Sequence, residues 1–170
     1  MSGLRIDVAE LIGRPGASKE ISRSEPLSGL RMPLGWVEED EPVELSLWAE
    51  SVLEGVEVSG SIAGTLHMHC SRCLIEYEER FDHEVRETFY SSKRDDEEYE
   101  VSSGTIDLEP MIRDLIVLNI PPQPLHDSSC KGLCPVCGAD RNETDCGHTQ
   151  DLSDMRWAPL RALLPKEVND

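Results

Sequence analysis

Two pairs of cysteines, each separated by two residues, constrain the fold of this chain more than any other feature of its sequence. The pairs are Cys70 with Cys73, and Cys134 with Cys137, and Gly138 directly follows the second pair. Two thiolates at this spacing can bind one metal ion from a single tight turn, and the glycine permits a backbone geometry that aims amides at the sulfurs. The second pair has the pattern of a zinc knuckle, and the first is a half-site of the same kind.

Further cysteines and histidines can complete metal sites with these pairs. Because a structural zinc takes four ligands, the set predicts one or two Zn²⁺ ions. One partition places Cys134, Cys137, Cys146 and His148 around one ion, and Cys70, Cys73, His126 and Cys130 around another. The alternative is a single all-thiolate site of Cys130, Cys134, Cys137 and Cys146, with Cys70 and Cys73 reduced or otherwise engaged.

A metal bound by four thiolates and imidazoles stabilises a fold and does not catalyse. Catalysis requires an open coordination position and a nearby general base, and the sequence shows neither. His67 and His69 alternate with apolar residues and are expected to be exposed on a strand. A thioredoxin-like role is disfavoured because no strand-helix-strand pattern surrounds either pair. The sequence therefore predicts a protein that is not an enzyme and has no catalytic residue.

The start of the chain and its apolar runs predict a cytoplasmic location. The first ten residues include Arg5, Asp7 and Glu10 and have no apolar segment of a secretory signal. The longest apolar run, Leu115 to Leu118, is far too short to span a bilayer, so no membrane contact is expected. Cysteines in a cytoplasmic protein stay reduced and are available to metals.

The charge of the chain favours basic partners. Its 34 acidic residues against 16 basic ones give a formal charge of −18, which repels polyphosphate and anionic lipid. A basic protein is therefore the expected partner. Direct contact with RNA stays open, because a local basic patch can exist on an acidic protein.

Apolar residues that alternate with polar ones predict an antiparallel sheet. An opening alternation at Leu4, Ile6 and Val8 is followed by a stretch from Gly13 to Gly35 that is expected to be a loop or a poorly ordered arm. Later runs begin at Val43 and Val56, and the Cys70 pair forms a hairpin tip before the next run. On one face these runs place Val43, Leu45, Leu47, Val56, Val58, Gly60, Ile62, Gly64, Leu66, Met68, Cys70, Ile75, Tyr77, Phe81, Val85 and Phe89.

From Asp107 the apolar period becomes helical. Asp107 is expected to cap a helix whose first turn contains Pro110 and which Pro121 and Pro122 end. Its apolar stripe, Leu108, Met111, Ile112, Leu115 and Ile116, needs a buried partner, which the sheet can provide. Apolar residues at Met155, Trp157, Leu160, Leu163 and Leu164 indicate a second, short helix.

The predicted fold class is α+β. An antiparallel β-sheet or partly open barrel is covered by a helix and followed by a zinc-binding segment and a short C-terminal helix. We expect a strand and flexible arm over residues 1–42, a sheet-and-helix core over 43–125, the zinc-binding segment over 126–150, and a helix and tail over 151–170.

The order of these motifs resembles the YceD family of large ribosomal RNA subunit accumulation proteins over roughly residues 43 to 165. The resemblance is carried by residues 70–74, 106–108 and 120–126, by the Cys-x-Gly-Leu-Cys-Pro-x-Cys-Gly pattern of residues 130–138, and by Asn142, Cys146, Asp154, Arg156, Trp157, Leu160 and Leu163. This chain has His126 and His148 where many relatives have cysteine.

The resemblance implies a role in accumulation or processing of large-subunit ribosomal RNA, in an operon context with a ribosomal protein. Combined with the acidic charge, it predicts a non-enzymatic ribosome-biogenesis factor that binds a basic ribosomal protein or a pre-large-subunit particle. The zinc end and the sheet face would form its rigid platform. The alternatives are a metal-dependent RNA-processing hydrolase, which needs a metal-bound water and a base, and a zinc-buffering or redox protein with a reactive thiol.

Overall fold

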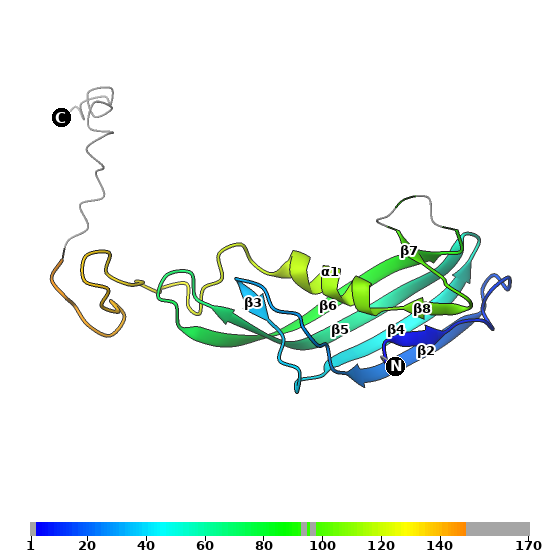
Figure 1. The fold of residues 1–170 in the computed structure, drawn as a ribbon, viewed down its shortest axis with the longest axis horizontal. Coiled ribbons are helices and arrows are strands. Elements are labelled where there is room, and N and C mark those ends of the chain that lie inside the picture. The colour runs from blue at the N-terminus through cyan, green and yellow to red at the C-terminus, as the bar shows by residue number, and fades with distance from the viewer. Residues whose placement is uncertain (1–2, 93–94, 96–97, 149–170) are drawn as a thin grey trace, which may run out of the picture.

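A long twisted sheet forms the body of the protein (Figure 1). The computed structural model describes residues 3–92, 95 and 98–148. The sheet has six strands: β2 (Ser18–Glu25), β4 (Val43–Val52), β5 (Gly55–His69), β6 (Glu76–Tyr90) and β7 (Tyr99–Glu100) in that order, with β3 (Gly35–Trp36) beside β5. All neighbours are antiparallel except β6 and β7. The sheet is open, and the described residues form no closed barrel.

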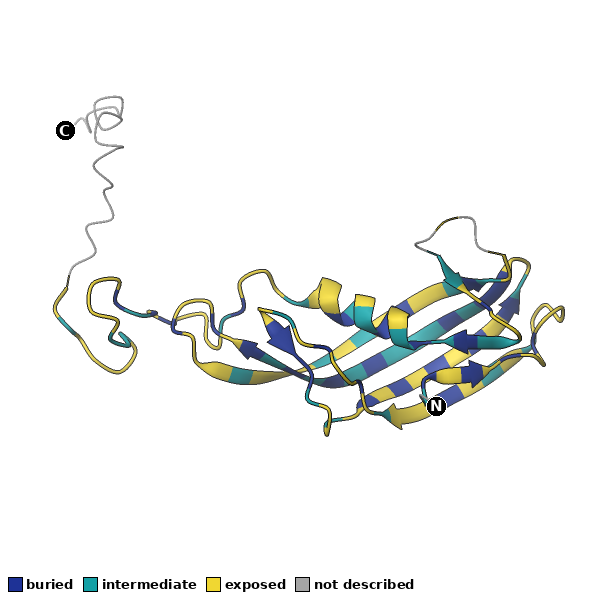
Figure 2. Ribbon diagram, in the orientation of Figure 1, coloured by how far each residue is buried: buried dark blue, intermediate teal, exposed yellow. Residues whose placement is uncertain are grey.

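The predicted alternation of the central strands is confirmed. In β4 the buried residues Val43, Leu45, Leu47 and Ala49 alternate strictly with the exposed residues Glu44, Ser46 and Trp48, as the blue and yellow bands of Figure 2 show. Strands β5 and β6 pair along their whole length, from Gly55 opposite Tyr90 to His69 opposite Glu76. The cysteine pair at Cys70 and Cys73 therefore lies at the tip of a long hairpin.

One helix and a two-stranded ribbon lie over the buried face of the sheet (Figure 1). Helix α1 (Glu109–Asn119) buries Met111, Ile112 and Ile116. The Asp107 carboxylate accepts a hydrogen bond from the Glu109 amide, which satisfies one free N–H at the start of the helix. Beside the helix, β1 (Arg5–Asp7) pairs with β8 (Thr105–Asp107). The apolar side chains that these elements bury form one core with the sheet.

The structure differs from the sequence predictions at the stretch before β3 and at Ile75. The stretch from Gly13 to Gly35 is not only a loop: it contains β2, in which Ile21 alone is buried, so the strand gives almost no hydrophobic period. Ile75 does not face the core, because it precedes β6 and is 51% exposed. The predicted C-terminal helix over 151–170 lies outside the described residues. Within the described part of the chain, no helix has the length and apolar character needed to cross a membrane.

Candidate metal centres

The first cluster of metal-ligating side chains lies at the tip of the β5–β6 hairpin. This hairpin-tip cluster consists of Cys70, Cys73, His126 and Cys130, whose ligand atoms all lie within 4.8 Å of one another. The Cys70 and Cys130 sulfurs are 3.8 Å apart, and the Cys73 sulfur is 3.5 Å from Nδ1 of His126. The three cysteines are buried in a small apolar cluster of their own, separate from the main core.

Backbone hydrogen bonds explain why residues far apart in sequence meet at this tip. The Cys70 amide donates to the Ile75 carbonyl at 2.9 Å and the Leu74 amide donates to the Cys70 carbonyl at 2.9 Å, which closes the turn. The Ser71 amide donates to the Pro124 carbonyl at 2.8 Å and ties the chain after α1 to the hairpin. His126 and Cys130 are thereby held against the turn.

The second cluster is formed within a short stretch of chain. This knuckle cluster consists of Cys134, Cys137, Cys146 and His148, again with all ligand atoms within 4.8 Å of one another. The Gly138 amide donates to the Cys134 carbonyl at 2.8 Å, and the positive φ of Gly138, 75°, lets the chain turn back there. The Cys134 sulfur lies 3.8 Å from Nδ1 of His148.

The two clusters match the four-ligand partition that the sequence suggested. Cys130 lies in the hairpin-tip cluster. The all-thiolate alternative required it to lie with the knuckle cysteines instead. Three sulfurs and one imidazole in a compact group suit Zn²⁺, which is bound tetrahedrally by such donors. The residues therefore fit a zinc ion at each cluster, and their ligation of it is our proposal.

Hydrogen bonds around each cluster favour one thiolate of each cysteine pair. Burial opposes ionisation of Cys70, but hydrogen bonds from His126 and from nearby backbone lower its pKa to about 5. Backbone hydrogen bonds from Cys137 and Val136 lower the pKa of Cys134 to about 6. In contrast, burial and the neighbouring sulfurs of Cys70 and Cys130 raise the pKa of Cys73 to about 11. A bound cation can displace this last proton.

Zinc binding is expected to release the Cys73 proton and hence to strengthen as pH rises. Because Cys73 is a thiol at neutral pH and Cys70 a thiolate, release of the Cys73 proton alone should increase the affinity of the hairpin-tip cluster about tenfold per pH unit between about pH 6 and pH 8. Below about pH 6, protonation of Cys134 should weaken the knuckle cluster as well. Competition with a chromogenic chelator, corrected for its own protonation, measures both effects, and an affinity independent of pH would contradict them.

Asn142 connects the two clusters. Its side-chain oxygen accepts a hydrogen bond from the Lys131 amide at 2.8 Å, and its nitrogen donates to the Cys130 sulfur at 3.4 Å. Arg72 adds a second link: its guanidinium donates to the Cys130 carbonyl at 2.8 Å, and its own carbonyl accepts from the Leu133 amide at 3.0 Å. Sequence reasoning gave neither residue a role at the metal, although Asn142 lies between two predicted ligands.

Replacing Asn142 with alanine is expected to weaken zinc binding at the hairpin-tip cluster by about tenfold to a hundredfold. A side chain that donates a hydrogen bond to a metal ligand fixes the orientation of that ligand. Loss of such a side chain typically lowers metal affinity by about this factor. Titration with Cd²⁺, followed by the thiolate-to-metal absorption band, measures the affinity. Asn119→Ala is the matched control, because among the described residues the Asn119 amide donates to the Leu115 carbonyl of its own helix and to no metal-ligating side chain. Equal affinities in both variants would remove Asn142 from the site.

Other polar groups of the structure have a structural explanation. Glu41, His67 and Glu78 also approach one another, but Nε2 of His67 is paired with Glu41 at 3.0 Å and its ring stacks on Trp36. His67 and His69 are strand residues, as the sequence predicts, although His67 is half-buried.

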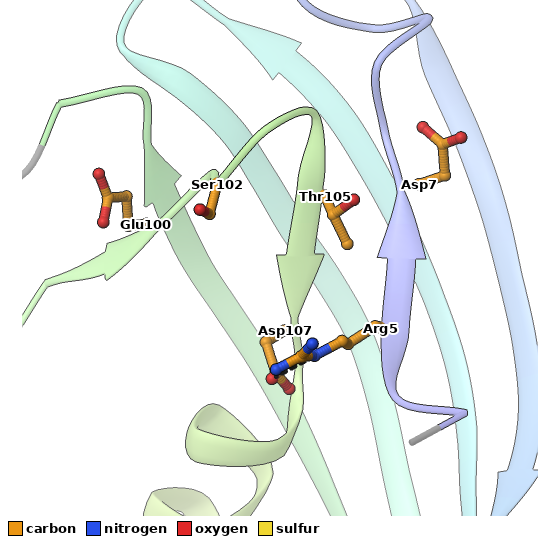
Figure 3. A pocket seen from close by; sticks show the side chains of 6 residues that line it. All are labelled: Arg5, Asp7, Glu100, Ser102, Thr105 and Asp107. Atoms are coloured by element: carbon orange, nitrogen blue, oxygen red, sulfur yellow. Dashed lines mark hydrogen bonds and ion pairs between the residues drawn. The ribbon is translucent and has the colours of Figure 1, made fainter. Parts of the chain in front are cut away.

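A polar hollow of about 460 Å³ lies beside the β1–β8 pair (Figure 3). Arg5 and Asp107 point toward each other there and form an ion pair at 3.1 Å. The Asp7 and Asp107 carboxylates also accept hydrogen bonds from the Ala9 and Glu109 amides. These contacts close the ends of local turns and indicate no ligand chemistry.

Comparison with known proteins gives a consistent result. Residues 58–164 match the family model described as large ribosomal RNA subunit accumulation protein YceD. A protein of Mycobacterium tuberculosis is 34% identical over 98% of this chain and 84% of its own length. YlbN of Bacillus subtilis is 27% identical over 94% of this chain and 96% of its own length.

A plant protein also matches. It is the Arabidopsis thaliana chloroplastic protein named large ribosomal RNA subunit accumulation protein YCED homolog 1, which is 40% identical over 34% of this chain and 18% of its own length. No solved structure matches this chain.

Proposed function

The chain belongs to the YceD family, and from this premise we propose that it is a cytoplasmic ribosome-biogenesis factor. It supports accumulation or processing of large-subunit ribosomal RNA by binding and not by catalysis. The observation that carries the proposal is the match over residues 58–164, since this range includes most of the long hairpin, the helix and both metal-ligating clusters.

In this proposal residues 43–125 form a rigid platform and residues 126–150 a metal-binding segment. A zinc ion bound at the hairpin-tip cluster would cross-link the sheet hairpin to this segment, and one bound at the knuckle cluster would join residues within the segment, which has little structure of its own. From Pro121 to His148 the described chain contains no helix or strand. Each ion would be held by four protein groups, the arrangement of a closed structural site.

The partner in this proposal is a basic ribosomal protein or a pre-large-subunit particle that presents one. The formal charge of −18 supports this class of partner, because opposite charges accelerate encounter and like charges suppress wrong partners. Association by this means weakens as salt increases.

Depletion of the protein tests the proposal. We expect depleted cells to accumulate unprocessed large-subunit ribosomal RNA and to show fewer mature large subunits in sucrose gradients. The protein itself should sediment with pre-large-subunit particles at low salt and leave them at high salt. Unchanged ribosomal RNA and subunit profiles after depletion would refute the proposal.

The number of protein ligands separates this function from the alternatives. A hydrolase needs a metal with an open position, whereas each cluster here offers four protein ligands. X-ray absorption of the zinc-loaded protein should show sulfur and nitrogen neighbours alone. A zinc-bound oxygen would favour the hydrolase, and rapid alkylation of the cysteines would favour a zinc-buffering or redox protein.

A further inference from the structure

The face of the sheet opposite α1 is open around Ser46, Trp48 and Glu84, which are exposed. At its other end it is partly covered, because Trp36 stacks on His67 and Glu41 is hydrogen-bonded to the same ring. Helix α1 and the β1–β8 ribbon cover one face, and within the described residues no helix or strand covers the other (Figure 1). We call this other face of β2, β4, β5 and β6 the outer face. The strand pairing assigns to it, among others, Glu20, Ser22, Ser46, Trp48, Ser59, Ser61, Glu84 and Arg86.

Small serine side chains leave a shallow depression at the centre of the outer face. Ser22, Ser46 and Ser61 are paired in one row across β2, β4 and β5, and Ser59 lies in the next row. A shallow hollow of about 540 Å³ lies here, between Ser46, Ser59, Ser61, Glu84 and Arg86. Sheet surfaces usually have β-branched or aromatic residues at such positions. The small hydroxyl side chains leave room for another chain and offer it hydrogen bonds.

A tryptophan stands at the border of this depression. Trp48 is paired with Glu20 on one side and with Ser59 on the other. It is 52% exposed, although its neighbours along the strand, Leu47 and Ala49, are buried in the core. Exposed tryptophans next to a hollow are the usual anchors of protein interfaces, and an indole face also attracts guanidinium and ammonium groups.

The charge of the outer face is strongly negative. Its acidic residues are Glu20, Glu44, Glu50, Glu57, Glu76, Glu78, Asp82 and Glu84. Its basic residues are Arg80 and Arg86, and Arg86 is bound to Glu57 at 2.9 Å. The face therefore attracts cationic side chains and repels phosphates.

We propose that the outer face is a docking surface for an extended protein segment rich in arginine and lysine. A cationic side chain of this segment stacks on Trp48, its backbone lies over the serines, and its other cations pair with the surrounding carboxylates. The inference rests on the proposed function and names the surface and the partner chemistry. A second copy would oppose acidic faces, and residues 149–170, with four acidic and three basic side chains, do not offer the required charge.

Binding of nona-arginine to the zinc-loaded full chain, measured by calorimetry at low salt, tests the inference. Trp48→Ala should weaken binding about tenfold, and Trp48→Phe should restore most of it, because an aromatic face returns. Asp82→Asn with Glu84→Gln should weaken binding by about threefold or more. The matched control is Glu79→Gln with Glu87→Gln, which removes the same charge from the same strand on the opposite face.

The two pairs of charge substitutions give the decisive comparison. Equal losses of affinity in both would show that only net charge matters and would overturn the inference. Tighter binding of oligo-uridine RNA than of nona-arginine, abolished by Trp48→Ala, would also overturn it in favour of RNA. If the outer-face variants bind nona-arginine normally while the protein still sediments with precursor particles, the docking surface is wrong and the proposed function stands.

Discussion

Replacing Cys70 with serine is expected to remove the metal ion from the hairpin-tip cluster and to free the chain after α1 from the sheet. A serine hydroxyl does not ionise near neutral pH and is a poor zinc ligand. Structural zinc sites bind with roughly 10–16 kcal/mol, so one ligand of four is worth about 3 kcal/mol, or about two orders of magnitude in Kd. Cys70 is also fully buried, so the remaining ligands cannot recruit another protein group without opening the turn.

The main core should survive this change. The hairpin-tip cysteines pack with Leu125 and Leu133 outside the core between the sheet and α1, and Tyr77 contacts both clusters. Without the ion, the later segment is held mainly by the hydrogen bonds of Ser71 to Pro124, of Leu133 to Arg72 and of Arg72 to the Cys130 carbonyl, together with the packing of Leu125 and Leu133. We therefore expect local unfolding of this segment and a folded sheet.

Metal counting and limited proteolysis measure this outcome. After dialysis against a chelator that leaves the original protein loaded, the zinc content should fall from two ions per chain to one. Trypsin should then cut after Lys131, which is exposed, faster than in the original chain. Cys137→Ser is the matched control: it should remove the other ion and leave the hairpin-tip cluster loaded. A single ion in the original protein that is lost on Cys137→Ser but not on Cys70→Ser would contradict the two-site partition.

Local patterns made the central part of this fold predictable. Strands β5 and β6, of fifteen residues each, keep a period of two that Glu79 and Glu87 of β6 interrupt, and the cysteine pair between them marks the turn. The helix was predictable because its apolar stripe begins beside Asp107 and ends before Pro121. The eight candidate ligands followed from residue type, and their partition followed from the short loops that join each cysteine pair.

Features that depend on distant contacts were not predictable. Strand β2 buries only Ile21 and forms because β4 offers it a hydrogen-bonding edge. The β1–β8 pairing joins Arg5 to Asp107, which lie about a hundred residues apart in the sequence. No local pattern of apolar and polar residues can indicate such a pairing. The Asn142 and Arg72 hydrogen bonds to the Cys130 region arise only after the hairpin tip and the knuckle meet. The contacts of Asn142 and Arg72 hold the two candidate metal clusters together beyond the β5–β6 hairpin tip.

The middle of the sheet depends on Gly60, and replacing it with alanine is expected to destabilise the protein strongly. Gly60 has a φ of 140°, which L side chains rarely adopt, and lies in β5 opposite Leu47 of β4. A Cβ at this position would overlap the Ser46 carbonyl oxygen and approach Cα of Leu47 to 2.9 Å. Since backbone cannot rotate away as a side chain can, β4 and β5 must separate locally.

Backbone strain and overpacking together predict a loss of about 4 kcal/mol in the free energy of unfolding of the Gly60→Ala variant. Urea denaturation followed by circular dichroism of the zinc-loaded protein measures it. Gly29→Ala is the matched control, because Gly29 also has a positive φ, 71°, but nothing lies within 4 Å of its added Cβ. It should lose only about 1 kcal/mol. If both variants unfold at the same urea concentration, the contact between β4 and β5 at Gly60 is not as close as the structure places it.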